Sequence, residues 1–95
     1  MQFITLSGKV YGTCELKKDI NGNDYIRFKL CCTGKDYGGK VKYTIYRCFC
    51  YDVTFRNLKN GDKVFLAGDI AMNIKTGEDG NACVQNDVYV KCISV

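Results

Sequence analysis

The chain has 95 residues, of which 46% are hydrophobic, and its fourteen basic and ten acidic residues leave a net charge of +4. This length suits one domain with one modest core, and the charge is too low for a disordered polycation. With no histidine, two serines and two glutamates, the chain is short of the groups that most nucleophile–base and histidine–metal sites need, so we expect neither an enzyme nor a cofactor.

The first third of the chain alternates apolar with polar residues, which predicts two strands with one buried face each. In the first strand the buried face consists of Ile4, Leu6 and Val10. Gly8 lies between them and predicts a bend or a bulge. Asn21-Gly22 is typical of a hairpin turn, and a second strand is predicted over residues 25–33. Its apolar face consists of Ile26, Phe28, Leu30 and Cys32.

The rest of the chain predicts three more strands and one short helix. A glycine-rich loop over residues 34–40 leads into a strand over 41–51, whose two faces both carry bulky residues. Asp52 can cap a helix of about two turns, and Gly61 can end it in a left-handed conformation. Strands over residues 63–74 and 83–95 follow, joined by a hairpin over 75–81.

The order β-β-β-α-β-β predicts an all-β fold, the five-stranded Greek-key barrel known as the OB-fold, formed by residues 1–95 as one domain. Such a barrel presents the face of its second and third strands to oligonucleotides or oligosaccharides. The fold alone does not decide between these ligands.

The distribution of charge favours a nucleic acid. Residues 1–47 hold nine basic and four acidic residues, a net +5, whereas residues 48–95 hold five and six, a net −1. Six of the basic residues fall between residues 25 and 47, interleaved with four tyrosines. Cations gain from releasing the counterions around phosphates, and aromatic rings stack on unpaired bases whatever their identity. This stretch therefore predicts a face that binds single strands.

We expect the seven cysteines to be reduced thiols. The N-terminus lacks the apolar stretch of a signal peptide, and no apolar run is long enough for a membrane helix. Cys31 and Cys32 are adjacent, and one residue separates Cys48 from Cys50, so the C-x₂-C spacing of a zinc site is missing. We therefore expect no metal site, and we expect the thiols to act as small apolar fillers. We also expect a cytoplasmic protein, in the host cytoplasm if its source is viral.

Several stretches in order along the chain resemble the bacterial and phage single-stranded DNA-binding proteins (SSB). Ile4–Val10 is similar to the family's first strand, Asn21-Gly22 falls where the family has Asn-Gly, and Phe28–Leu30 resembles its second strand. Arg47–Tyr51 looks like the run before the helix. The strongest similarity lies in Leu58–Ile70, which resembles the family's stretch after the helix, and Asp79-Gly80 falls in its last hairpin.

The resemblance implies an OB-fold that assembles into a homo-oligomer, dimer or tetramer, and protects single-stranded DNA in replication, recombination or repair, with replication proteins as further partners. Tyr51 matches a stacking aromatic, and another stacking position falls on Ile45 or, if one residue is missing here, on Tyr46. Tyr37 lies near a loop aromatic of the family. The chain stops at Val95 without the acidic tail of full-length bacterial relatives, which resembles a minimal phage, plasmid or primosomal member.

We expect the binding face to combine the aromatic and basic residues of the second and third strands and their loop with lysines that contact phosphates. The face residues are Tyr25, Arg27, Lys29, Tyr37, Tyr43, Arg47, Phe49 and Tyr51. The phosphate contacts are Lys9, Lys35, Lys40, Lys42 and Lys75. Two alternatives stay open: an adaptor protein of a replication complex whose nucleic-acid binding is incidental, and a binder of single-stranded RNA, since nothing in the sequence identifies a 2′-hydroxyl contact.

Overall fold

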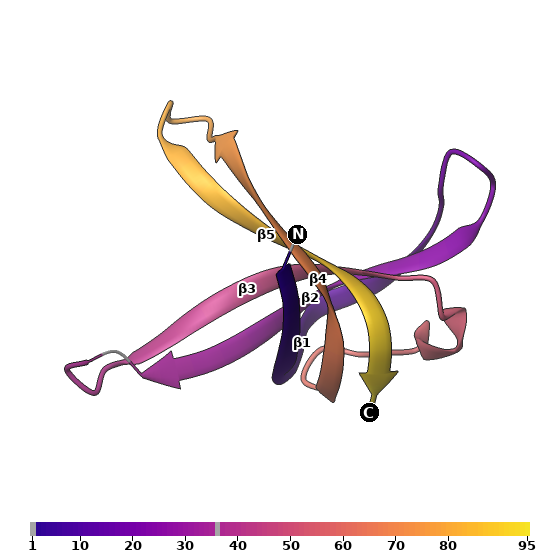
Figure 1. Ribbon diagram of the computed structural model, residues 1–95, viewed down its shortest axis with the longest axis horizontal. Coiled ribbons are helices and arrows are strands. Elements are labelled where there is room, and N and C mark those ends of the chain that lie inside the picture. Colours follow the sequence, from indigo (N-terminus) through magenta and orange to yellow (C-terminus); the bar gives the residue numbers. More distant parts are fainter. Residues whose placement is uncertain (1, 36) are drawn as a thin grey trace.

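Five strands form one sheet that closes into a barrel with the strand order β1-β2-β3-β5-β4 (Figure 1). The computed structural model describes residues 2–35 and 37–95. Its strands are β1 (Gln2–Lys18), β2 (Asp24–Lys35), β3 (Val41–Cys50), β4 (Lys63–Thr76) and β5 (Ala82–Ser94). The predicted five-stranded Greek-key barrel is confirmed. No helix of the described residues is long and apolar enough to cross a membrane.

β1 closes the barrel, because it is long enough to pair with two strands. Its first half pairs with β4 and its second half with β2, in both cases antiparallel. On the far side, β3 pairs with β5 in parallel. Three hairpins project beyond the barrel: β1–β2 at the right of Figure 1, β2–β3 at the lower left and β4–β5 at the top. The projecting β2–β3 hairpin is called the arm below.

The core is formed by the inward side chains that the alternation predicted. Residues contributed by all five strands and by Leu58 are buried together. On β3, where both faces carry bulky residues, Cys48 and Cys50 are 0% and 2% exposed. The odd-numbered residues of β3 therefore point outward, because successive side chains of a strand alternate between its faces.

The sequence predicted a bend or a bulge at Gly8, but no bulge lies there, and the irregular part of β1 is close to Gly12. The β1–β4 ladder continues unbroken through Gly8, whereas the β1–β2 register shifts between Tyr11 and Glu15. There Gly12 has a φ of 84°, a left-handed conformation that glycine adopts at no steric cost. Gly8 has a different role, because a Cβ at this position would lie 2.5 Å from the carbonyl oxygen of Cys31.

The predicted two-turn helix is a single 3-10 turn, Val53–Phe55. Asp52 does cap it, since its carboxylate accepts hydrogen bonds from the backbone N–H of Thr54 (3.2 Å) and from its hydroxyl (2.6 Å). The chain then returns to the barrel, where the N–H of Gly61 donates to the carbonyl oxygen of Val10 (2.8 Å). A longer helix would have used such backbone groups in its own hydrogen bonds.

Candidate nucleic-acid interface

The outward face of β2 and β3 carries most of the predicted binding residues, and their register brings them into pairs. Arg27 lies opposite Phe49, Lys29 lies opposite Arg47, and Thr33 lies opposite Tyr43. Side chains at paired positions of neighbouring strands project from the same face of the sheet. The outward face of β2 and β3 is therefore a continuous row of rings and cations along the outside of the barrel, which we call the strip.

Four aromatic rings form a row, which we call the aromatic platform: Tyr51, directly after the end of β3, and Tyr25, Phe49 and Tyr89 on β2, β3 and β5. The ring centres are 5.6 Å apart for Tyr51 and Tyr25 and 6.1 Å apart for Tyr25 and Phe49. Phe49 and Tyr89 are 5.5 Å apart and nearly parallel, with 19° between their planes. These separations lie in the range of favourable ring contacts. The platform thus offers several adjacent flat surfaces at one end of the strip.

Tyr51 is held in place by the β1–β2 hairpin. Its hydroxyl donates to the carboxylate of Asp19 (2.9 Å), which also accepts from the backbone N–H groups of Asn21 and Asn23. The hydrogen bonds to Asn23 and Tyr51 hold the pKa of Asp19 below its ordinary value, and the bond to Asp19 raises the pKa of Tyr51. The ring stays 58% exposed, so it is oriented and still available for stacking.

Arg47 is bound to a buried carboxylate. Its Nε and one terminal nitrogen donate to the two oxygens of Asp87 at 2.9 and 3.0 Å. Asn73 and Gln85 donate to the same carboxylate at 3.0 and 3.2 Å. Burial opposes the charge of Asp87, but these hydrogen bonds outweigh it and lower the pKa of the carboxyl group. The guanidinium carbon lies 5.0 Å from the ring centre of Phe49, so the pair also supports the platform.

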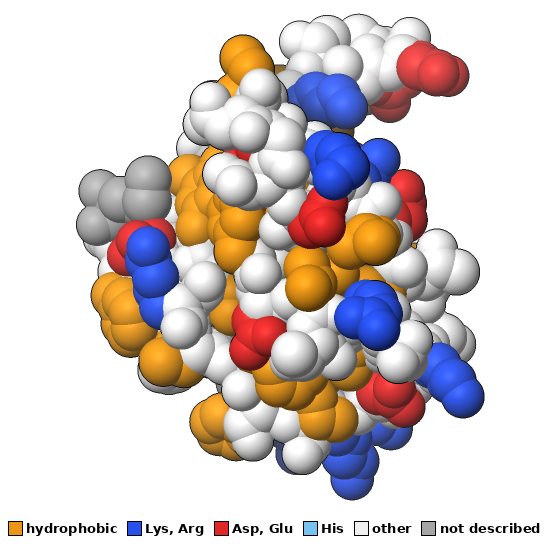
Figure 2. All heavy atoms as spheres, turned by 90° about the vertical axis from the view of Figure 1, so that its right-hand side faces the viewer, with side chains coloured by type: hydrophobic (Ala, Val, Ile, Leu, Met, Phe, Trp, Pro, Cys, Tyr) orange, Lys and Arg blue, Asp and Glu red, His pale blue; other side chains and the backbone are white. Residues whose placement is uncertain are grey.

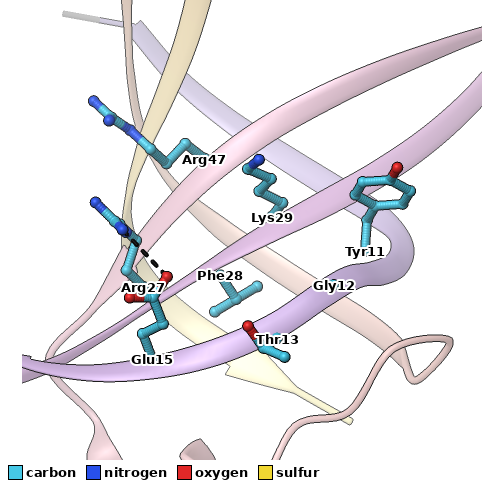
Figure 3. A pocket seen from close by; sticks show the side chains of 8 residues that line it. All are labelled: Tyr11, Gly12, Thr13, Glu15, Arg27, Phe28, Lys29 and Arg47. Atoms are coloured by element: carbon cyan, nitrogen blue, oxygen red, sulfur yellow. Dashed lines mark hydrogen bonds and ion pairs between the residues drawn. The ribbon is translucent and has the colours of Figure 1, made fainter.

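Lys29 is the central cation of the strip with no ion-pair partner among residues 2–35 and 37–95. Its neighbour Arg27 forms an ion pair with Glu15 at 3.2 Å, drawn as the dashed line in Figure 3. Both side chains line a groove of about 340 Å³ together with Tyr11, Thr13 and Arg47. Lys29 therefore presents its charge at the edge of a cleft between β1 and β3.

A second groove lies on the other side of Arg47, beneath the β4–β5 hairpin. It measures about 380 Å³, and Lys29, Arg47 and Lys75 supply its cations, with Ile45 and Cys83 on its walls. The structure thus brings the predicted Lys75 to the same strip, although it lies 28 positions after Arg47 in the sequence.

The remaining predicted residues are spread along the arm and β1. Tyr43 lies on the outward face of the arm, Lys35 lies near its end on the same face, and Lys42 lies on the opposite face, paired with Gly34. Tyr37 is fully exposed in the loop at the tip, and Lys40 is exposed in the same loop. Asp36 lies outside the described residues.

The resemblance left a second stacking position open between Ile45 and Tyr46. Of these two residues, Ile45 lies on the outward face of β3 and is 40% exposed.

Tyr46 and Lys9 have contrasting positions. Tyr46 packs against the hydrophobic core from the inward face of β3. Lys9 lies on β1 opposite Cys31, on the outward side of the barrel. The structure therefore groups Lys9 with the strip and keeps the ring of Tyr46 away from it.

Some cations of the first half of the chain form ion pairs with acidic residues of the same half. Lys18 pairs with Asp24 at 2.8 Å, and Lys17 pairs with Glu15 at 3.4 Å. Figure 2 shows the side of the molecule at the right of Figure 1, where basic and acidic side chains are interspersed. This side carries no continuous field of one sign, so the local cations of the strip matter more than the total charge.

The sequence interpretation missed Tyr89 and Asp87, which complete the site from β5. Both lie opposite β3 residues of the strip, Asp87 beside Arg47 and Tyr89 beside Phe49. The alternation of Asp87-Val88-Tyr89-Val90 was a signal that they share one face. The parallel pairing of β3 with β5 supplies the contact. Among the described residues, no three Cys, Asp or Glu side chains lie close enough together to hold a metal ion.

The solved structures that match this architecture include two single-stranded DNA-binding proteins. A small single-stranded DNA-binding protein from Streptomyces coelicolor superposes with a TM-score of 0.81, covering 98% of this chain and 92% of that chain at 20% identity. A Plasmodium falciparum SSB in complex with single-stranded DNA gives a TM-score of 0.70, covering 94% and 85% at 18% identity. This chain has the OB-fold of these SSB proteins. No protein-family profile and no curated protein sequence matches it.

In this OB-fold, the strip extends from the platform on β2, β3 and β5, past Lys29, to the outward side of the arm. Two grooves border it, one toward β1 and one toward the β4–β5 hairpin. An elongated ligand with flat apolar groups and regularly spaced anionic groups would match this arrangement of rings and cations.

Proposed function

We propose that residues 1–95 act as one domain that binds single-stranded DNA without sequence preference. The observation that carries the proposal is the aromatic platform on the outward face of the barrel. It continues along β2 to Lys29, a cation with no ion-pair partner in the described part of the chain. The fold supports it, since the two SSB proteins with this architecture are named as single-stranded DNA-binding proteins or hold such DNA.

Stacking on the platform would supply most of the affinity. Each base that stacks on an aromatic ring contributes about 1–3 kcal/mol in single-strand binders, whatever the base. Tyr51 is oriented by Asp19 before any ligand arrives, so little side-chain freedom remains to be lost on binding. Arg47 supports Phe49 and lends cation character to the platform, although its charge is balanced by Asp87.

Phosphate contacts would come from the lysines that border the strip. Lys29 and Lys75 have no ion-pair partner among the described residues, so a phosphate would gain their charge without breaking an existing pair. Lys42 would contact the strand from the opposite face of the arm. Release of counterions makes such contacts dependent on salt, with a slope of about 0.7 per phosphate for single strands.

The test is a titration of the intrinsic tyrosine fluorescence with oligo-dT at several salt concentrations, since the chain has no tryptophan. We expect strong quenching by the wild type at about 0.2 M salt, a loss of affinity at every salt concentration for Tyr51→Ala, and a smaller salt slope for Lys29→Ala. Lys42→Ala serves as the matched comparison on the other face of the arm and should lower the slope less.

Weak wild-type binding that salt abolishes would contradict the proposal and favour the adaptor function. Competition between oligo-dT and oligo-rU of equal length separates DNA from RNA, since only RNA offers the 2′-hydroxyl.

We propose further that the protein is a homo-oligomer that protects single strands during replication or recombination. Phe3 and Phe65 lie exposed on the outward side of β1 and β4, and Phe65 lines a groove of about 310 Å³ together with Cys92 of β5. This surface is distinct from the strip, so a second subunit there would leave the strip accessible. Light scattering should give a mass of two or four times 10.7 kDa, and a monomer would contradict the assembly.

A further inference from the structure

Two lysines face each other at the end of the β1–β4 ladder. Lys9 of β1 and Lys63, the first residue of β4, occupy directly opposite positions in this antiparallel pair. Both side chains are exposed, and neither has an ion-pair partner among residues 2–35 and 37–95. The neighbouring Asp62 carboxylate accepts a hydrogen bond from the backbone N–H of Lys59 (2.8 Å). Like charges in directly opposite positions destabilise a sheet, so this pair lowers the stability of the free protein.

The two lysines line the largest of the surface grooves described here. It measures about 580 Å³ and is also bordered by Ser7, Cys31, Thr33 and Tyr43. Its floor includes Gly8, whose lack of a Cβ lets β1 pass close to the backbone of Cys31. Tyr43, 69% exposed, stands on the opposite wall. The groove therefore combines two cations, neither of them in an ion pair with a described residue, with one accessible ring.

The groove is continuous with the strip. Lys63, Lys9, Cys31 and Ile45 are successive partners across β4, β1, β2 and β3. Cys31 follows Lys29 by two positions on the outward face of β2, and Tyr43 lies two positions before Ile45 on β3. A strand that leaves the platform past Lys29 would reach this groove without crossing another element.

We propose that this groove is a second nucleotide site, in which Lys9 and Lys63 hold a phosphodiester and Tyr43 stacks on an adjacent base. The inference rests on the proposed function and extends it, because Lys63 and the groove lie outside the platform and its cations. Lysine ammonium groups act as point charges toward phosphate, and a ring beside them gives the site a preference for nucleotides over simple anions. The repulsion between the lysines would be relieved when the phosphate binds.

The experiment compares two lengths of oligo-dT, since single-strand binders of this fold cover about 4–16 nucleotides. With about 15 nucleotides, Lys63→Gln should lower the salt slope by about 0.7, the value for one phosphate contact. With about 5 nucleotides, which the platform can accommodate alone, Lys63→Gln should bind like the wild type. Lys59→Gln, which removes the same charge four positions earlier, is the matched control and should change neither slope.

The ring is tested separately. Tyr43→Ala should weaken binding of the longer oligo-dT and leave binding of an abasic strand of equal length unchanged, whereas Tyr43→Phe should bind oligo-dT like the wild type. Equal weakening toward both strands would overturn the assignment of Tyr43.

Three further results separate the outcomes. A wild type that binds neither length contradicts the proposed function itself. A wild type that binds both lengths, with Lys63→Gln indistinguishable from it on the longer one, overturns the second site alone. In the absence of DNA, the urea midpoint of Lys63→Gln should equal or exceed that of the wild type, because a repulsive pair has been removed. A lower midpoint would contradict the repulsion between the two lysines, and equal competition by polyglutamate would overturn the nucleotide site.

Discussion

Tyr89 is the residue that extends the platform onto β5. Its ring is stacked against Phe49 and is 40% exposed, so one part supports the neighbouring ring and another can accept a base. We expect Tyr89→Ala to lower the affinity for oligo-dT about fivefold, the low end of the range for one stacked base, because the ring is partly covered already. Fluorescence titration at fixed salt measures the effect.

Tyr89→Phe is the control for this prediction. The hydroxyl of Tyr89 has no hydrogen-bond partner among the described residues, so the phenylalanine variant should keep the affinity of the wild type. An alanine variant that binds as tightly as the phenylalanine variant would exclude Tyr89 from the platform.

Asp87 gives the site a dependence on pH. Burial of its carboxylate opposes ionisation, but the hydrogen bonds from Arg47, Gln85 and Asn73 outweigh it and lower its pKa. A lowered pKa adds stability above the unfolded-state value, about 3.9, and this stability is lost as the pH falls through the folded-state value. Replacing the carboxylate by an amide, in Asp87→Asn, should lower the free energy of unfolding by about 1–3 kcal/mol near neutral pH.

Urea unfolding at about pH 7 and about pH 3 tests this role of Asp87. The wild type should lose more stability on acidification than Asp87→Asn, which no longer carries the titrating group. Asp87→Asn should still lose some stability on acidification, since Asp19, Asp79 and Glu15 also have lowered pKa values. Identical losses in both proteins would show that Asp87 contributes no acid-sensitive stability.

At the scale of the elements, Gly68 sets the approach of β4 to β5. The β4–β5 register shifts between Ala67 and Gly68, and a Cβ at Gly68 would overlap the carbonyl group of Tyr89. We expect Gly68→Ala to lower the free energy of unfolding by about 1–3 kcal/mol, the usual cost of overpacking. Because the backbone of Tyr89 must shift, the variant should also bind oligo-dT more weakly.

Gly34→Ala is the matched control for Gly68→Ala. Gly34 also lies within a strand, but a Cβ there would meet no atom within 4 Å, so this variant should unfold at the same urea concentration as the wild type or a higher one. If both alanine variants lost the same stability, the close approach at Gly68 would not be the cause.

The sequence predicted the features of the strands that depend on residues close together in the chain. Alternation placed the strands and chose the buried faces of β1 and β2 correctly, because one side of each strand faces the core. The helix was overestimated, because its length depends on the long-range hydrogen bonds that tie Gly61 and Asp62 to Val10. The bulge was assigned to the wrong glycine for a similar reason, since the β1–β2 register is a property of two strands.

The candidate site shows the same division. The sequence predicted that the rings and cations of β2 and β3 share one face, because alternation places them on one side of each strand and a loop joins the two strands. Tyr89 and Asp87 were missed because a parallel pair between β3 and β5 brings them in from 40 positions away. The pairing of Arg27 with Glu15 and of Arg47 with Asp87 was equally invisible, so the sequence did not show which cations of the strip form ion pairs.

At the scale of the whole molecule, the cysteines report which residues are inside the barrel. Cys48 and Cys50 are buried, whereas Cys83 and Cys92 are exposed. Burial raises the pKa of the Cys48 and Cys50 thiols, and a thiol reacts with alkylating reagents only as the thiolate. In the native protein, iodoacetamide should therefore modify Cys83 and Cys92 first and should modify Cys48 and Cys50 only after unfolding. Mass spectrometry of the labelled peptides measures each rate.

The two exposed cysteines also lie in different grooves of the molecule and can locate the bound strand. Cys83 lines the groove beneath the β4–β5 hairpin with Lys75 and Arg47, whereas Cys92 lines the groove beside Phe65. Saturating oligo-dT should slow the labelling of Cys83 severalfold and leave the rate of Cys92 unchanged. Each thiol serves as the internal control for the other, since a general change in reactivity would affect both. Protection of Cys92 alone would move the DNA to the surface that we assign to a second subunit.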